Sequence, residues 1–209
     1  MPEKVFIDIA SWTTLPEREI RTGLAESIKH ALIASPSLLN YIEKNVDKIL
    51  LRIESKEENL SEMFSKSETC ARLVKKNIKI KQKYVKKDFY DNKGLREALN
   101  FGHTFGRALE TVSNYKLNHG EAISIGMMLA LKLSNFDEID RIKKLLEYIG
   151  LPTSIPDYIG KNELVKKLYT DKKVRNSQIN FVLLKRIGKT YTKSYDETTL
   201  MNFLLREIQ

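Results

Sequence analysis

The chain contains three histidines, and the residues around them have spacings that could assemble a metal site. In the first predicted helix, Glu26, Lys29 and His30 share one face. His119 opens another predicted helix, where the helix dipole favours a neutral imidazole that can bind a metal. Glu26, His103 and His119 come from three predicted helices and make a plausible zinc set, because three protein ligands leave one position open for a substrate. His30 is left as a packing or supporting histidine, and Glu26 with Lys29 as an alternative surface ion pair.

A row of polar residues follows a helical spacing in the middle of the chain. The spacing predicts a helix over 93–113, and one face of it would carry Arg96, Asn100, His103 and Arg107. Solvated helix faces favour Lys and Glu, so a histidine between arginines and an asparagine is as consistent with a binding site as with an exposed surface.

A lysine interrupts an apolar row in the preceding predicted helix, over 58–87. Val74, Ile78 and Val85 are spaced by four and seven, and Lys81 is the position that completes the row. A lysine directed inward must extend its ammonium to solvent or bind an anion, because an unpaired buried charge is costly. Both readings of Lys81 stay open.

The remaining pattern predicts a mainly α fold with little β structure. A strand is expected over 4–10, and the segments 178–184 and 189–195 are expected to pair as a hairpin around Gly188. Periodicity predicts further helices over 17–34 and 163–169 and a last helix from about Asp196. Capping signals predict three more: one from Pro36 to Glu54, one that Asn118 caps with Glu121 at its third position, and one that opens at Asn135 with Glu138 and ends at Gly150.

The strand at 4–10 has no partner among the later predicted elements. An isolated strand leaves its backbone groups unpaired and is not stable in water. We therefore expect residues 1–16 to be the remnant and linker of a missing domain, and residues 17–209 to form one helical domain.

The composition narrows the class of protein. The chain has 209 residues, 42% of them hydrophobic and 30% charged, as in soluble globular proteins. Its single cysteine, Cys70, excludes an internal disulfide and suits the cytoplasm. No signal peptide and no run of 18 apolar residues is present, so no membrane partner is expected. The net charge of +9 is spread over lysine-rich helices, and without a nucleic-acid-binding motif we expect no nucleic-acid partner.

Several stretches of the sequence resemble one enzyme family. "TLPEREIRTGLAESIKHALI", "GLREALNFGHTFGRALE", "HGEAISIGMMLA" and "DKKV" occur in the order found in 3-dehydroquinate synthases, members of the sugar-phosphate cyclase group. Such enzymes have an NAD-binding α/β domain followed by a helical metal-binding domain. The resemblance therefore implies the helical C-terminal domain of the dehydroquinate synthase-like fold, with a lone N-terminal strand and a small late hairpin. The glycine-rich turn that would hold the NAD pyrophosphate is absent from the sequence.

The resemblance also implies the reaction and the site. The reaction converts 3-deoxy-D-arabino-heptulosonate 7-phosphate to 3-dehydroquinate and phosphate in the shikimate pathway, with NAD and with zinc or another divalent metal such as cobalt. By resemblance the metal ligands are Glu26, His103 and His119. The positions that match substrate-binding residues are Lys29, Lys81, Arg96, Asn100 and Lys172, and those that match an NAD-contacting segment are Ser11, Trp12, Thr13 and Thr14. Members of the family commonly form homodimers, and the chain alone is expected to be inactive without its NAD-binding half.

Arg107 departs from the family pattern. The family places a second histidine here, in "GHTxGHA", to meet the substrate phosphate. Arginine keeps the anion binding, because its planar fork suits phosphate, but it cannot release a proton at neutral pH. We expect an anion clamp, and the alternative is a surface arginine paired with Glu110. The departure leaves two other functions open, a related cyclase with a different substrate and a non-catalytic metal- or anion-binding module.

Overall fold

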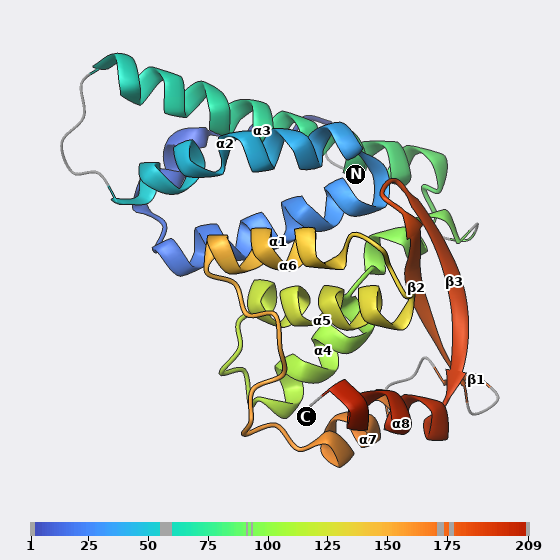
Figure 1. The fold of residues 1–209 in the computed structure, drawn as a ribbon. Helices are drawn as coiled ribbons and strands as arrows, with labels where there is room; N and C mark the ends of the chain where they lie inside the picture. Colours follow the sequence, from blue (N-terminus) through green and yellow to red (C-terminus); the bar gives the residue numbers. More distant parts are fainter. Residues whose placement is uncertain are drawn as a thin grey trace.

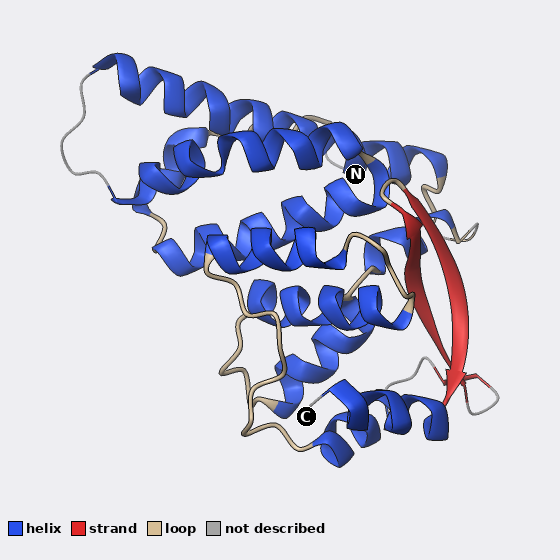
Figure 2. Cartoon of the chain, viewed as in Figure 1, coloured by secondary structure: helices blue, strands red, loops and turns tan. Residues whose placement is uncertain are grey.

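The computed structural model describes residues 3–54, 60–90, 92, 94–170, 174–175 and 178–207. It is mainly helical, with one small antiparallel sheet along one side (Figures 1 and 2). The α-helices are α1 (Glu17–Ala34), α2 (Pro36–Glu54), α3 (Leu60–Lys87), α4 (His103–Val112), α5 (His119–Leu133), α6 (Ile139–Ile149), α7 (Lys161–Thr170) and α8 (Glu197–Glu207). The other elements are the 3₁₀ helices η1 (Ile9–Thr14) and η2 (Leu95–Asn100) and the strands β1 (Val174–Arg175), β2 (Gln178–Arg186) and β3 (Lys189–Asp196).

The helices form stacked layers. In Figure 1, α2 and α3 lie together above α1, while α5 and α4 follow below and α7 with α8 closes the lower end. The packing agrees with this view, since α1 contacts α2, α3 and α5, and α4 contacts both α5 and α7. α1 and α4 thereby lie on opposite sides of α5.

Helix α5 is the centre of the core. Every residue from Ala122 to Leu131 is buried, as expected for a helix that is apolar on all sides. Its N-terminus has the predicted capping box, in which the Asn118 side chain accepts from the Glu121 backbone and the Glu121 side chain accepts from the Asn118 backbone. The cap fixes where α5 begins, and His119 is its first residue.

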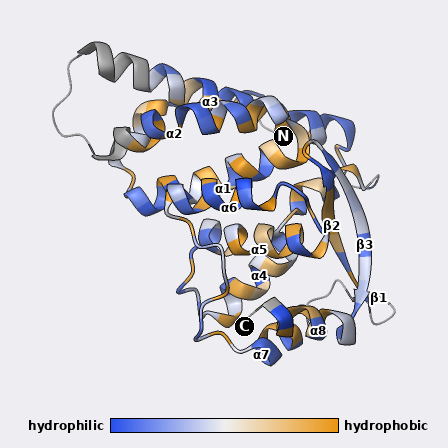
Figure 3. Ribbon diagram, viewed as in Figure 1, coloured by the Kyte–Doolittle hydropathy of each residue, from blue (hydrophilic) through white to orange (hydrophobic). Residues whose placement is uncertain are grey.

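The late hairpin is confirmed. β2 and β3 pair antiparallel, and β1 adds a short third strand at the edge of β2. β2 is the more hydrophobic strand and packs against α5, whereas β3 is largely polar and exposed (Figure 3). Gly188 turns between them with φ of 82°, and its N–H donates to the carbonyl of Leu32 at 2.7 Å. The turn thereby ties the hairpin to α1.

Most predicted helices are confirmed, but the helix expected over 93–113 is not continuous. Gly102 lies between η2 and α4 with φ of 74°, a left-handed conformation that breaks a helix. A Cβ at Gly102 would lie 2.7 Å from the Met127 side chain, so α5 also requires glycine here. The chain reorients at this glycine, and the row of four polar residues on one continuous face was therefore a wrong prediction.

Two smaller predictions are also wrong. Residues 4–8 form no strand, because no neighbouring strand among the described residues offers hydrogen bonds, and Asp8 instead caps η1. Asn135 does not cap a helix with Glu138. It adopts φ of 50° at the end of α5, and its backbone N–H donates to the carbonyl of Lys132. No helix among the described residues is long and apolar enough to cross a membrane.

Candidate metal centre

Glu26 stands in the middle of α1 with its two carboxylate oxygens in different surroundings. Oε2 accepts a hydrogen bond from the Lys29 ammonium at 2.6 Å, within one helical turn. Oε1 is buried and has no hydrogen-bond partner among the described residues. Burial would raise the pKa of Glu26, but the nearby Lys29 ammonium outweighs it and lowers the pKa below its ordinary value. Glu26 is therefore an ionised carboxylate with one free oxygen.

His103 reaches the same point from the start of α4. Its Nδ1 lies 3.2 Å from the carbonyl oxygen of Phe101, an arrangement in which Nδ1 carries the proton and donates it. Its Nε2 then bears a lone pair and lies 3.6 Å from Glu26 Oε1. Burial, with a second contribution from the Lys29 charge, lowers the pKa of His103 to about 4. The ring is therefore neutral at physiological pH.

His119 approaches from the start of α5. Its Nε2 also lies 3.6 Å from Glu26 Oε1, and its Nδ1 lies 3.0 Å from Glu110 Oε1. The two imidazole rings stand edge to face with centroids 5.4 Å apart. The His119 side chain is 45% exposed and that of His103 is 11% exposed, so the cluster opens to solvent on the His119 side.

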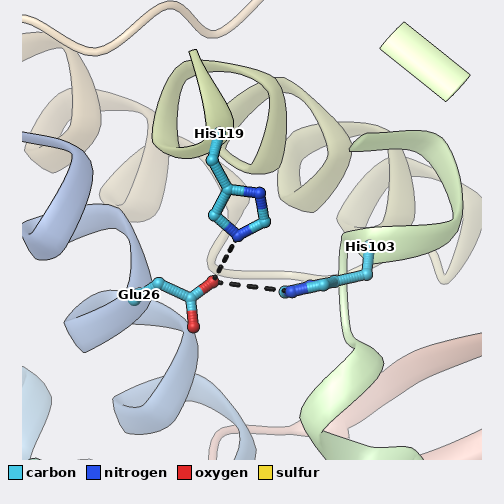
Figure 4. A group of neighbouring side chains, drawn as sticks. All are labelled: Glu26, His103 and His119. Carbon is cyan, nitrogen blue, oxygen red and sulfur yellow. Dashed lines mark ion pairs between the residues drawn. The ribbon is translucent and has the colours of Figure 1, made fainter. Parts of the chain in front are cut away.

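The three side chains converge as expected for metal ligands (Figure 4). One ligand atom from each of Glu26, His103 and His119 lies within 4.8 Å of the others. A buried carboxylate oxygen without a hydrogen bond is costly, and a cation held between it and two imidazole nitrogens would remove that cost. Two neutral imidazoles and one carboxylate are also the donor set of catalytic zinc sites with three protein ligands. The residues therefore fit a divalent metal.

Positive side chains surround this cluster. Lys29 is only 3% exposed, and burial lowers the pKa of its ammonium against the opposing effect of Glu26. The charges of Lys81 and Arg107 also act on Lys29. Lys81 is exposed, so its ammonium reaches solvent, and its charge acts on Lys29 beside the cluster. The anion-binding reading of Lys81 stays a prediction.

His30 is a supporting residue beside the cluster. Its Nδ1 lies 2.8 Å from Asn77 Oδ1, and the Asn77 amide in turn donates to Ser27 Oγ and to the Leu73 carbonyl. The network joins α1 to α3. His30 thus takes the packing or supporting role that its position on α1 left open.

The structure describes three of the four remaining predicted substrate residues. Arg96 and Asn100 are half-buried on η2, on the other side of the Gly102 turn from α4. Arg107 is exposed on α4 and lines a small hollow with His103, Thr104 and Lys167. Lys172 lies outside the described residues.

The segment expected to contact NAD forms η1. Ser11 Oγ donates to the Asp8 carbonyl at 2.7 Å and Thr14 Oγ1 to the Ser11 carbonyl at 3.2 Å, while the Thr13 side chain lies outside the described residues. Trp12 is half-buried and lines a largely apolar cavity of about 230 Å³ that extends to Glu26. The NAD-contacting role of Ser11, Trp12, Thr13 and Thr14 stays a prediction.

Sequence reasoning missed three polar residues near the cluster. Glu110 lies two turns after His103 on α4 and contacts His119, whereas the sequence indicated it only as a partner for Arg107. Lys167 reaches the Arg107 hollow from α7, and no local signal marks it. Arg18 on α1 donates to both oxygens of Glu121 and to the carbonyl of Lys116, which holds the start of α5 against α1.

The chain matches one known protein family over most of its length. The family model described as 3-dehydroquinate synthase C-terminal matches residues 23–174. A 3-dehydroquinate synthase of Acetivibrio thermocellus is 37% identical over 214 residues, covering 99% of this chain and 55% of that relative. One from Thermoanaerobacter pseudethanolicus is 40% identical over 210 residues, covering 97% of this chain and 55% of the relative. The chain thus spans about half the length of these relatives.

Solved structures share the fold at lower identity. A 2-epi-5-epi-valiolone synthase from Streptomyces hygroscopicus with NAD⁺ and Zn²⁺ bound has a TM-score of 0.78 and 21% identity, and the match covers 96% of this chain and 54% of that one. A 2-deoxy-scyllo-inosose synthase complexed with carbaglucose-6-phosphate, NAD⁺ and Co²⁺ has a TM-score of 0.73 and 21% identity, with 99% and 56% covered. The matched family model and the 3-dehydroquinate synthase relatives show that the chain belongs to the 3-dehydroquinate synthase C-terminal family.

Proposed function

We propose that the chain is the metal- and substrate-binding half of a 3-dehydroquinate synthase. The whole enzyme would convert 3-deoxy-D-arabino-heptulosonate 7-phosphate to 3-dehydroquinate and phosphate, in the shikimate pathway. The observation that carries the proposal is the convergence of Glu26, His103 and His119 around one buried, unpaired carboxylate oxygen. Residues 1–16 would belong with an NAD-binding half, which supplies most of the dinucleotide site.

The chemistry of the proposed site would come partly from a metal ion and NAD and partly from the side chains of this chain. Zinc or cobalt, when bound, would supply a Lewis acid for substrate oxygens. NAD would supply a reversible hydride acceptor that oxidises a substrate hydroxyl to a ketone, and the ketone makes the neighbouring C–H bond more acidic. Glu26, His103 and His119 would hold the metal. Lys29 keeps Glu26 ionised and oriented, because its ammonium takes Oε2 and leaves Oε1 for the metal.

The cationic residues would bind the anionic ends of the sugar phosphate. Arg107 offers a planar fork for the phosphate leaving group, and Lys167 lines the same hollow. The other proposed contacts to substrate hydroxyls, carboxylate and phosphate are Lys29, Lys81, Arg96, Asn100 and Lys172. Binding the phosphate stabilises the charge that it gains as its C–O bond breaks.

The identity of the substrate rests on sequence similarity. The chain is 36–40% identical to several 3-dehydroquinate synthases, whereas its structural neighbours with other substrates are 21% identical. As part of the same proposal the enzyme is cytoplasmic, in agreement with a buried Cys70 that forms no disulfide, and forms a homodimer.

The arginine at position 107 favours one second candidate, a non-catalytic metal- or anion-binding module derived from such an enzyme. An arginine cannot act as an acid or base at neutral pH, so any proton transfer assigned to a histidine there would be absent. Both candidates share the metal centre and differ in turnover.

The first test is the zinc content and zinc affinity of the purified chain. We expect one equivalent of zinc, and we expect Glu26→Ala, His103→Ala and His119→Ala each to weaken binding strongly because each removes a ligand. The matched control is Glu97→Ala, which removes an exposed carboxylate from η2 and should bind zinc like the wild type. Zinc binding that is indifferent to the three ligand changes would contradict the proposed metal centre.

Turnover separates the two candidate functions. The chain is mixed with the separately produced NAD-binding half of a related synthase, NAD, zinc and the heptulosonate phosphate, and released phosphate is measured. Phosphate release that needs both halves and is lost in His103→Ala supports the enzyme. No release by a mixture that binds zinc and NAD normally would favour the non-catalytic module.

A further inference from the structure

The two nitrogens of the His119 ring have different partners. Nε2 faces Glu26 Oε1 at 3.6 Å, in the position of a metal ligand, while Nδ1 lies 3.0 Å from Glu110 Oε1. Because the two nitrogens are on different edges of the ring, Glu110 lies behind the imidazole and not among the three ligand atoms that converge. A carboxylate at Nδ1 accepts a hydrogen bond from the Nδ1–H group, so Nδ1 keeps the proton and Nε2 keeps its lone pair.

His119 needs such a partner more than His103 does. The His103 side chain is 11% exposed, and its Nδ1 is fixed by the Phe101 carbonyl. The His119 side chain is 45% exposed, so packing restrains its ring less. An exposed imidazole in water can rotate and can carry its proton on either nitrogen.

Glu110 lies on a helix that packs closely against the helix that carries His119. Its side chain is 19% exposed and belongs to α4, the helix that also begins with His103. α4 packs closely against α5, where Gly126 allows the Gly102 carbonyl to approach the helix. One helix therefore presents a ligand to the site and, two turns later, a carboxylate to the other histidine.

We propose that Glu110 is a positioning residue for the metal centre, which holds the His119 ring with its proton on Nδ1 and its Nε2 lone pair directed at the metal. The inference rests on the proposed function, because it assumes that the three converging side chains bind a metal. Carboxylates behind ligand histidines fix the tautomer and the ring orientation, and their loss weakens metal binding by about 10- to 100-fold.

The test uses two readouts on the wild type, Glu110→Ala and Glu110→Gln. The first is the dissociation constant for zinc, measured by competition with a chromophoric chelator. The second is the ¹⁵N spectrum of the metal-free chain at about pH 8, where imidazole is mostly neutral and the shifts report which nitrogen carries the proton. The control is Glu97→Gln, which removes one exposed carboxylate from η2 and changes the net charge by the same amount as Glu110→Gln.

We expect Glu110→Ala to weaken zinc binding about 10- to 100-fold and to lose the Nδ1-protonated form of His119. Glu110→Gln should retain part of both, because its amide oxygen still accepts from Nδ1. Glu97→Gln should match the wild type. Urea unfolding of each variant confirms that the fold is intact.

Two results would overturn the inference. One is an unchanged His119 tautomer in Glu110→Ala, and the other is a loss of zinc affinity no larger than that of Glu97→Gln. Failure of the proposed function has a different signature, because the wild type and Glu26→Ala would then bind zinc equally poorly. The tautomer of the metal-free chain would still decide whether Glu110 fixes the ring.

Discussion

Single carboxylates in this protein serve two partners at once. Glu26 gives Oε2 to Lys29 and keeps Oε1 for the two histidines. Glu121 accepts from the Asn118 backbone N–H within the capping box and also binds the guanidinium of Arg18. Glu26 therefore links Lys29, one turn along α1, to the two histidines on other helices. Glu121 likewise links the N-terminus of α5 to Arg18 on α1.

The Arg18–Glu121 pair leads to a prediction about pH. The hydrogen bond from Arg18 lowers the pKa of Glu121 below its unfolded value of about 4.3. A lowered carboxylate pKa stabilises the fold above the unfolded pKa, and this stabilisation disappears as the pH falls through the folded pKa. Glu121→Gln should therefore be less stable than the wild type at pH 7, by about 1 kcal/mol because Arg18 is half exposed, and the difference should vanish at strongly acidic pH.

Urea unfolding at a series of pH values measures this difference. Glu68→Gln serves as the control, because Glu68 forms an exposed pair with Arg72 on α3 and its loss should have little effect at any pH. A Glu121→Gln effect that is the same at pH 7 and at pH 3 would show that the charge of Glu121 is not what stabilises the start of α5.

Residue types and spacing predicted part of the site. Glu26, His103 and His119 were predicted as one set, and the structure brings them together. Lys81 was expected to point inward and either to extend its ammonium to solvent or to bind an anion, and the structure places this side chain at the surface. Glu110 was considered only as a partner for Arg107. Its contact with His119 depends on how α4 packs against α5, which a single helical pattern does not contain.

At the scale of elements, two facing helices are brought together by glycine. A Cβ at Gly126 would lie 2.1 Å from the Gly102 carbonyl oxygen and 2.9 Å from the Gly106 nitrogen. These neighbours are backbone atoms and cannot rotate away. The close approach of α4 to α5 sets the separation of His103 and His119, which begin these two helices.

Gly126→Ala should therefore destabilise the protein by about 1–3 kcal/mol or more, because the added methyl group pushes α4 away from α5. The same displacement should weaken zinc binding. Gly23→Ala is a matched control with the opposite sign. Gly23 lies inside α1, and no neighbouring atom lies within 4 Å of the place that an alanine methyl group would take, so alanine should stabilise the helix by about 0.5–1 kcal/mol. Thermal unfolding and zinc titration of both variants check the pair. Equal effects of the two substitutions would contradict this account of the α4–α5 contact.

Local signals predicted the elements well where the helix ends carried caps. The Asn118 capping box, the Gly150 end of α6 and the Gly188 hairpin all appear in the structure. The helix over 93–113 was wrong because its periodicity continues through Gly102, which has a left-handed backbone and lies so close to Met127 that there is no room for a Cβ. The strand over 4–10 was wrong because a strand needs a partner, and apolar alternation alone supplies none.

At the scale of the whole molecule, the first residues expose an unusual amount of apolar surface. Val5, Phe6 and Ile7 are 72%, 90% and 51% exposed. Side chains so exposed contribute little to the stability of this chain. Under the proposed function they would pack against the NAD-binding half.

Phe6→Ser should accordingly leave the free energy of unfolding of this chain within about 0.5 kcal/mol of the wild type. It should weaken assembly with an NAD-binding half, measured by calorimetry with the separately produced domain. Leu205→Ser, on the partly exposed face of α8, is the control and should assemble normally. Undiminished assembly of Phe6→Ser would remove the proposed role of these residues.

The three converging side chains come from helices that are far apart along the chain, so their arrangement exists only when α1, α4 and α5 have packed together. A metal bound there favours the folded state over the unfolded one, by about 2.7 kcal/mol when the free metal is at 100 times its dissociation constant. That amount is a large part of the stability of an ordinary domain. Under the proposed function, the cellular supply of zinc would thus affect how long the folded chain survives proteolysis, in addition to any effect on turnover.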